Sequence, residues 1–361
     1  MMIVPHSKPT MGEDDIEAVS AVLKSGMIGQ GAVIETFEKI FAEYNGVKGG
    51  VAVNSGTAAL HLALLSLGIG PGDRVMIPSY VCIALYHSLR YVGAIPVLVD
   101  SVKNRWEMDA QWAEDYLKKC SKDQRVKAIV AVHLFGKPLN MDDYTGLSRK
   151  YSIPIIEDCA QSVGAEYHGK KIGSFGEVSI FSFYATKVMT TGEGGMVLSN
   201  SKRMLARIKD LREYDEKKDD RLRFNYKMTD FQAAMGIRQL KKLPKFIEKR
   251  RSIAKKYLNR LQKLPIALPE PSDHTKDIYY RFVVRMNEPD LFMEGMQRRG
   301  IICRRPVFMP IHRIIKHCIL PHSERIWRQA VSLPIYPSLK EDAVEKVIKC
   351  TKRILEERKD L

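Results

Sequence analysis

A lysine that could act as a nucleophile stands at the end of a predicted strand. Lys187 follows the segment 178–183 and precedes a glycine-rich turn at 191–195. The segment is apolar, β-branched and aromatic, which is typical of a strand buried on both faces. An ammonium ion is costly to desolvate there, whereas a free amine can form a Schiff base. A lone lysine at a strand end is usually a surface residue, so this hypothesis depends on its neighbours.

A carboxylate ends a second predicted strand. Residues 154–157 form this strand, and Asp158 follows it, with Gln161 shortly after. In a parallel sheet, side chains at the carboxyl ends of strands converge on one crevice. A carboxylate at such a place can cap a helix or bind a metal. It can also keep the ring nitrogen of a pyridine protonated, which makes the ring an electron sink.

A turn that suits an anion lies further upstream. Residues 51–53 predict a strand, the turn Asn54-Ser55-Gly56-Thr57 follows, and an apolar helix begins at Ala58. This order directs backbone N–H groups and the positive end of the helix dipole at an anion. Ser55 and Thr57 are also common helix caps, so the turn alone leaves both readings open. An amine, an acid and a phosphate site together are what pyridoxal 5′-phosphate (PLP) requires.

At these residues the chain resembles a known family, the DegT/DnrJ/EryC1/StrS sugar aminotransferases, which have the fold type I of aspartate aminotransferase. The resemblance runs nearly end to end. It is carried by Lys8-Pro9-Thr10-Met11-Gly12, Ile28-Gly29-Gln30-Gly31, Asn54 to Leu60, Pro71-Gly72-Asp73, Glu157 to Gln161, Ser182 to Lys187, Thr191 to Gly195, Asn225 to Asp230, Pro310-Ile311-His312 and Ser332 to Pro337.

The resemblance implies a role for each residue of the predicted cofactor site. Lys187 forms the internal aldimine and moves the proton, Asp158 pairs with the pyridinium nitrogen, and Gln161 lies beside the ring. The cofactor phosphate is held by Gly56, Thr57 and Ser182, and Ser55 is a further cofactor-binding residue. Asn225 reaches across a homodimer interface to the phosphate of the neighbouring subunit.

The chain departs from the family pattern near the cofactor ring. Cys82 stands among the cofactor-binding positions, where many relatives place an aromatic ring that stacks on PLP. Tyr80 and Tyr86 are the nearest candidates to supply such a ring. Tyr184 stands where relatives often have His or Phe, and Met27 stands where an aromatic residue is frequent.

The same resemblance implies the reaction. L-Glutamate donates its amino group, and pyridoxamine 5′-phosphate is the intermediate form of the cofactor. A nucleotide-linked keto-sugar accepts the amino group in a second half-reaction. Two half-reactions at one site predict ping-pong kinetics. The candidate substrate contacts are Lys227, Tyr184, Tyr214, Arg304 and His312. One related branch replaces the lysine with histidine and removes a hydroxyl instead, and Lys187 argues against that branch. Another PLP reaction on the same fold, such as elimination from a sugar, is the alternative.

Charge is the unusual feature of the composition. The net charge is +16, and residues 241–361 hold 28 Lys and Arg against 14 Asp and Glu. A nucleic-acid-binding regulatory protein is therefore a distant alternative, but no helix-turn-helix or aromatic RNA signature supports it. The basic residues of 241–262 alternate with apolar ones at helical spacing, which favours an amphipathic helix with a solvated basic face.

The remaining patterns predict the fold class and the compartment. Strands at 51–53, 75–77, 95–99, 128–133, 154–157, 178–183 and 195–199 alternate with helices. This predicts a mostly parallel seven-stranded α/β sheet covered on both faces, in a large domain at 1–240, followed by a smaller α+β domain at 241–361. The last two strands are expected to pair antiparallel. Six cysteines without paired spacing, no metal-ligand pattern and no membrane span or signal peptide predict a cytoplasmic enzyme without a metal.

Overall fold

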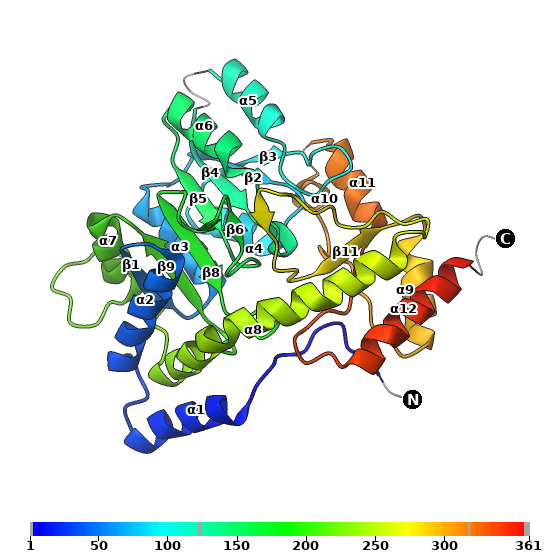
Figure 1. The fold of residues 1–361 in the computed structure, drawn as a ribbon. Helices are drawn as coiled ribbons and strands as arrows, with labels where there is room; N and C mark the ends of the chain where they lie inside the picture. Colours follow the sequence, from blue (N-terminus) through cyan, green and yellow to red (C-terminus); the bar gives the residue numbers. More distant parts are fainter. Residues whose placement is uncertain (1–2, 122–124, 317, 357–361) are drawn as a thin grey trace.

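The computed structural model describes residues 3–121, 125–316 and 318–356. A seven-stranded sheet forms its centre (Figure 1). In spatial order the strands are β1 (Gly49–Val53), β9 (Gly195–Ser199), β8 (Val178–Ser182), β5 (Ile155–Asp158), β4 (Val126–Val132), β2 (Arg74–Pro78) and β3 (Ile95–Val99). Only β9 runs antiparallel to its neighbours β1 and β8. The predicted strands and the antiparallel pairing at β9 are confirmed.

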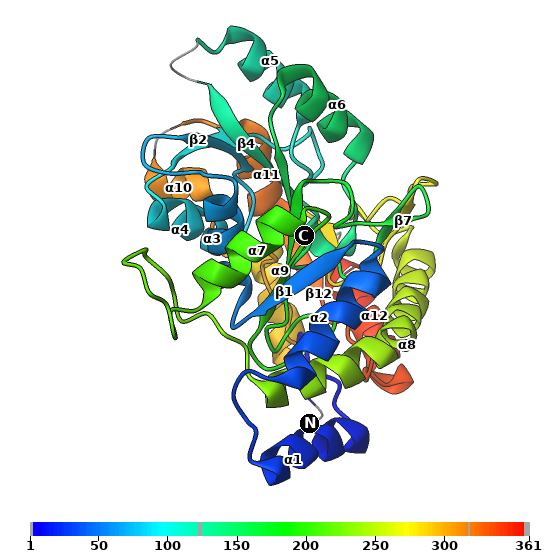
Figure 2. The same cartoon turned by 90° about the vertical axis from the view of Figure 1, so that its left-hand side faces the viewer.

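The two faces of the sheet bury alternate residues of the same strands. In β9, Met196 and Leu198 pack on one face and Val197 on the other, as the period of two requires. Helices α2 (Ala32–Asn45), α5 (Ala110–Lys119) and α6 (Met141–Tyr151) contribute to the first core, and α3 (Gly56–Ser66), α4 (Ile83–Tyr91) and α7 (Lys202–Arg212) to the second. Figure 2 shows these helices on the two sides of the sheet.

The long helix α8 (Asp230–Leu261) links the two parts of the chain. It begins in a capping box formed by Thr229 and Gln232, earlier than the helix predicted near 241. Its first half packs against α2 and α1 (Glu13–Ser25), while its second half joins a third core. The predicted boundary between residues 240 and 241 lies inside this helix.

The third core belongs to the smaller α+β part. It is built from the second half of α8 and from β11 (Phe282–Arg285), β12 (Ala330–Leu333), α9 (Pro289–Arg298) and α12 (Glu341–Glu356). Strands β11 and β12 pair antiparallel. Shorter elements complete the fold: β6 (Glu166–Tyr167), β7 (Lys170–Lys171), β10 (Thr275–Lys276), η2 (Leu134–Gly136), α10 (Ile311–Ile315) and α11 (Pro321–Gln329).

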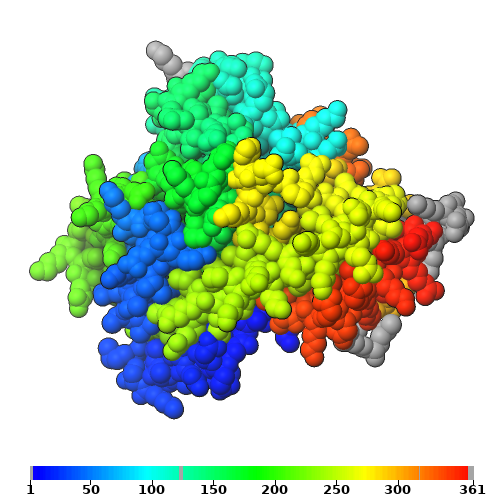
Figure 3. Space-filling view, in the orientation of Figure 1, coloured from blue at the N-terminus to red at the C-terminus, as the bar shows by residue number. Residues whose placement is uncertain are grey.

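The basic helix predicted from the charge pattern is amphipathic in the structure. Leu243, Phe246 and Tyr257 of α8 are buried, while Lys245 and Lys249 are exposed. Figure 3 shows α8 as a yellow-green band across one surface of the molecule. None of the helices within the described ranges is long and apolar enough to cross a membrane.

Candidate active site

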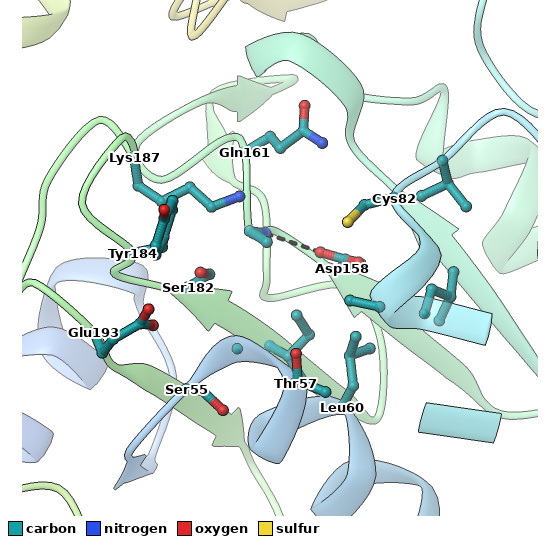
Figure 4. Close-up of a pocket in the computed structure, with 16 residues that line it drawn as sticks. Ser55, Thr57, Leu60, Cys82, Asp158, Gln161, Ser182, Tyr184, Lys187 and Glu193 are labelled. Carbon is teal, nitrogen blue, oxygen red and sulfur yellow. Dashed lines mark hydrogen bonds between the residues drawn. The ribbon is translucent and has the colours of Figure 1, made fainter. Parts of the chain in front are cut away.

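The carboxyl ends of β1, β5 and β8 meet at one pocket. This pocket has a volume of about 310 Å³, which is in the range of small-ligand sites. Its lining includes Ser55, Gly56, Thr57, Cys82, Asp158, Gln161, Ser182, Tyr184, Lys187 and Glu193. The structure therefore brings together the lysine, the acid and the anion-binding turn (Figure 4). Tertiary structure unites them because all three strands point the same way in the sheet.

Lys187 lies in a turn immediately after β8. Its backbone N–H donates to the carbonyl of Tyr184 at 2.9 Å, and its side chain points into the pocket (Figure 4). The amine lies 5.4 Å from the centre of the Tyr280 ring. No carboxylate within the described ranges forms an ion pair with this amine. The amine is therefore available to a ligand in the pocket.

Among the residues that the structure describes, Asp158 is a buried acid without an ion-pair partner. Its carboxylate accepts a hydrogen bond from the backbone N–H of Ala160 at 3.0 Å, drawn as the dashed line in Figure 4. Burial raises the pKa of the Asp158 carboxyl above its usual value, and the hydrogen bond from Ala160 and the charge of Lys187 oppose this shift. A cation hydrogen-bonded to the carboxylate would remove the cost of burial, and a protonated ring nitrogen is such a cation.

The turn before α3 forms a cradle for an anion. Ser55 caps the helix by accepting from the N–H of Ala58 at 3.1 Å, so the capping reading of this residue is correct. Gly56 faces Ser182 so closely that a Cβ at Gly56 would lie 2.7 Å from the Cβ of Ser182. Because Gly56 has no side chain, the start of α3 can approach Ser182 this closely. Gly56, Thr57 and Ser182 line the pocket at the N-terminus of α3, which is the positive end of the helix dipole.

Gln161 is held in place beside the same pocket. Its side-chain oxygen accepts from the N–H of Phe135 at 3.0 Å, which fixes the plane of the amide. Phe135 itself has a φ of 61°, a conformation that costs free energy for a residue with a side chain. The strained turn at η2 thus positions Gln161.

The expectation that Tyr80 or Tyr86 supplies a stacking ring is not met by the structure. Tyr80 is fully buried in the core behind α4, and Tyr86 lines a different cavity at the edge strand β3. Cys82 lines the pocket, and the aromatic ring in the lining is that of Tyr184, a half-exposed side chain. The helical phase of α4 turns Tyr86 away, which the sequence spacing did not indicate.

The other predicted contacts lie outside the lining of this pocket. His312 is buried, with Nδ1 2.7 Å from the Ser79 hydroxyl and Nε2 3.3 Å from Glu324. Both ring nitrogens are thus satisfied within the fold, which leaves neither for a substrate in this structure. Arg304 is exposed and its backbone pairs with Ser332.

The segment 213–229 carries three further predicted contacts. Tyr214 and Asn225 are exposed, and the carbonyl of Asn225 accepts from the side chain of Asn54 at 3.2 Å. The amine of Lys227 forms an ion pair with Asp215. None of the three lines the pocket of the same chain. A ligand that they contact would therefore have to extend beyond this pocket or be bound by a neighbouring subunit.

Three residues near Lys187 were not selected from the sequence. Glu193 lines the pocket, although its glycine-rich turn was part of the recognised pattern. Tyr280 and Arg281 come from the segment just before β11; Tyr280 approaches the amine of Lys187, and Arg281 stacks on Tyr280. These contacts depend on how the smaller part packs, so no local signal could have identified them.

Tyr280 has an unusual electrostatic environment for a buried phenol. Burial alone would raise its pKa, but the positive charges of Lys187 and Arg281, together with a hydrogen bond to the Thr186 side chain, lower the pKa of Tyr280 to about 8. The ionised form of this phenol would therefore be stabilised by the positive charges of Lys187 and Arg281.

Comparison with known proteins identifies the family of this chain. The family model of the DegT/DnrJ/EryC1/StrS aminotransferase family matches residues 9–352. A GDP-perosamine synthase of Escherichia coli O157:H7 is 34% identical over 95% of this chain and 96% of its own. Another GDP-perosamine synthase, from Caulobacter vibrioides, is 36% identical over 90% of this chain and 91% of its own.

A solved structure extends the agreement to the whole fold. The aminotransferase TlmJ from Streptoalloteichus hindustanus superimposes with a TM-score of 0.93 at 29% identity, covering 99% of this chain and 100% of that one. The protein is an aminotransferase of fold type I. It belongs to the DegT/DnrJ/EryC1/StrS aminotransferase family, which is PLP-dependent.

Proposed function

We propose that this protein uses PLP to transfer the amino group of L-glutamate to a keto group of a nucleotide-linked sugar. The observation that carries the proposal is one pocket in which a lysine and a buried acid, neither ion-paired within the described ranges, converge with an anion cradle. When bound, the cofactor supplies an electron sink that stabilises a carbanion next to nitrogen.

The residues of the chain have distinct tasks in this proposal. The amine of Lys187 would anchor the cofactor and, once free, would be placed to take a proton from the amino donor. Asp158 would keep the ring nitrogen protonated, because its own burial favours a cationic partner. Gly56, Thr57 and Ser182 would hold the phosphate, and Gln161 would contact the ring.

The acceptor class is supported by the relatives. Two of them are named GDP-perosamine synthases, so a GDP-linked keto-sugar is the first acceptor to test. The experiment is incubation of the protein with L-glutamate and a panel of nucleotide-linked keto-sugars, with products identified by mass. Release of 2-oxoglutarate together with an aminated sugar supports the proposal. Sugar consumption without 2-oxoglutarate would instead indicate elimination.

We also propose that the active site is completed by a second subunit of a homodimer. Asn225 is exposed and lies outside the lining of its own pocket, a position suited to contact the phosphate bound by a neighbouring chain. This predicts complementation between two inactive variants. Mixed dimers of Lys187→Ala and Asn225→Ala chains contain one site with both residues intact, so remixing the two after dissociation restores activity. Absence of any recovery would contradict a shared site.

A further inference from the structure

The positive charge of the chain concentrates on helix α8, and the proposed function does not account for it. The chain has a net charge of +16, and residues 230–261 alone hold ten Lys and Arg against two acids, Asp230 and Glu248. Cations that the fold pairs with its own carboxylates are structural, whereas exposed and unpaired ones are available to an anionic partner. The contacts of each cation in α8 therefore decide between these two roles.

The ten cations of α8 divide into those that the fold uses and those that it leaves free. Three form ion pairs with neighbouring helices, namely Lys242 with Asp15, Lys256 with Glu341 and Arg260 with Glu345. Two donate to backbone carbonyls, namely Arg250 and Arg251. The other five are exposed and form no ion pair within the described ranges, and we call them the basic row: Arg238, Lys241, Lys245, Lys249 and Lys255.

The basic row lies on one side of α8. With 3.6 residues per turn and a rise of 1.5 Å, its members fall within an arc of about 120° and along about 25 Å of the helix. The other side of α8 buries Leu243, Ile247 and Ile253 in the cores. Glu248 is the exposed acid within the same arc, so five cations less one acid leave a net charge of +4 on this side. Figure 3 shows the outer side of α8 uncovered along the molecular surface.

The shape of this surface indicates the kind of partner. The basic row lines neither the reactive pocket nor the cavity at β3, and it lies on an open helix surface. Among the described residues, none of the exposed large apolar side chains belongs to α8, so the row has no ring on which a nucleic-acid base could stack. A helix that is packed along its length also cannot enter the major groove of a duplex. A bilayer surface, by contrast, offers a broad layer of negative charge that needs no groove.

We propose that the basic row of α8 binds the protein reversibly to anionic lipid headgroups at a membrane surface. The inference goes beyond the proposed function and does not depend on it. Each Lys or Arg near an anionic bilayer increases the affinity about fivefold. Because α8 exposes no large apolar side chain, the attraction is electrostatic and no part of the helix inserts into the hydrocarbon.

The first measurement is cosedimentation of the full-length protein with lipid vesicles. Vesicles of phosphatidylcholine alone are compared with vesicles of equal parts phosphatidylcholine and phosphatidylglycerol. The wild type should bind the anionic vesicles and not the neutral ones. Its affinity should fall steeply as the ionic strength rises to about 0.15 M, where the Debye length is about 8 Å, because screening weakens a purely electrostatic attraction.

Three combined substitutions test whether the basic row makes this contact. In the variant with Lys241→Gln, Lys245→Gln and Lys249→Gln, the affinity for the anionic vesicles should fall about 100-fold, at roughly fivefold for each lost charge. Glutamine preserves the helix, since its helix propensity is close to that of lysine. Amino transfer in solution should be unchanged, because the three lysines lie outside the reactive pocket.

The matched control removes the same charge from other surfaces. Lys103, Lys170 and Lys202 are exposed lysines outside α8, and their combined change to glutamine should leave the affinity for the anionic vesicles within about twofold of the wild type. Equal losses in the two triple variants would show that net charge alone attracts the protein to the vesicles, which would overturn the role of the basic row.

Three further results would overturn the inference. One is a wild type that binds neither kind of vesicle at low salt, and another is equal binding to neutral and anionic vesicles. The third is tighter binding to a DNA duplex of random sequence than to the anionic vesicles at the same salt concentration, with the loss of DNA binding in the α8 variant. That result would assign the basic row to nucleic acid instead of a membrane surface.

Discussion

The buried charges of this protein fall into two groups, those that the fold satisfies and those that it leaves open. Glu157 belongs to the first group, because it accepts from the N–H groups of Gly173, Phe175 and Gly176 at 2.6 to 2.7 Å and lies 3.2 Å from His133. Its neighbour Asp158 belongs to the second group, with a single backbone donor. The two acids are adjacent in sequence, yet strand alternation turns one toward the core and the other toward the pocket.

The difference teaches how to distinguish structural from functional charge in this fold. The first group closes on itself, and the network of Ser79, His312 and Glu324 is a further example. The open charges, Asp158 and Lys187, meet at one cavity and have no ion-pair partner among the described residues. An unpaired buried charge lowers the stability of the folded protein. A ligand that binds the folded state and pairs with this charge raises the stability again.

The largest effect is expected at the lysine. Lys187→Ala removes both the covalent anchor and the base, so amino transfer should fall by about 10⁴-fold or more. The measurement is 2-oxoglutarate release under saturating L-glutamate, together with the absorbance of the lysine-bound cofactor, which should disappear. Retained turnover in this variant would reject the proposed mechanism.

A smaller loss is expected at the open acid. Asp158→Asn cannot keep the ring nitrogen protonated, and turnover should fall on the order of 10²- to 10³-fold while the protein remains folded. The comparison variant is Asp273→Asn, which changes an exposed acid and should have no effect on turnover. Equal rates in Asp158→Asn and the wild type would show that the acid has no role in the reaction.

The satisfied acid should respond in stability. Glu157→Gln leaves backbone donors with a weaker acceptor in the core, so the free energy of unfolding should fall by about 2–4 kcal/mol, measured by urea denaturation. Glu341→Gln, which alters an exposed ion pair with Lys256, should change it by less than about 1 kcal/mol. If Glu157→Gln is as stable as the wild type, the distinction between closed and open charges does not hold for this pair.

The phosphate cradle should be sensitive to a single methyl group. In Gly56→Ala the new Cβ meets Ser182, so one side of the cradle must shift, and the affinity for PLP should fall about tenfold. Titration of the protein freed of cofactor measures this change. Gly29→Ala is a suitable control, because a Cβ there meets nothing within 4 Å.

The last prediction concerns the pH dependence of stability at His6. Its pKa in the folded state is about 3, below the usual 6.5, so the unfolded chain binds the proton first as the pH falls. Between these values the wild type should lose stability relative to His6→Gln, by about 1.4 kcal/mol per pH unit at most. Urea denaturation of both proteins at several pH values tests this, and curves that stay parallel would contradict it.

The sequence by itself determined the sheet and the residues at its strand ends. Apolar runs at 178–183 and 154–157 predicted the strands, and the parallel arrangement then implied that Lys187, Asp158 and the turn at Ser55 share an edge. The site roles assigned to these residues stay predictions, although their convergence is observed. Local patterns sufficed here because strand direction follows from the alternation of strands and helices.

Only the tertiary structure decided what surrounds the reactive amine. Tyr280 comes from a distant part of the chain and lies 5.4 Å from the amine of Lys187, because α8 carries the smaller part back against the pocket. Arg281 contacts Tyr280, and His6 contacts Arg281. Likewise His312 lies within a network with Ser79 and Glu324, and Tyr86 lies at another cavity. The physical reason is that long-range packing decides whether a polar side chain is buried and which group it pairs with. The spacing of residues along the chain carries no information about this packing.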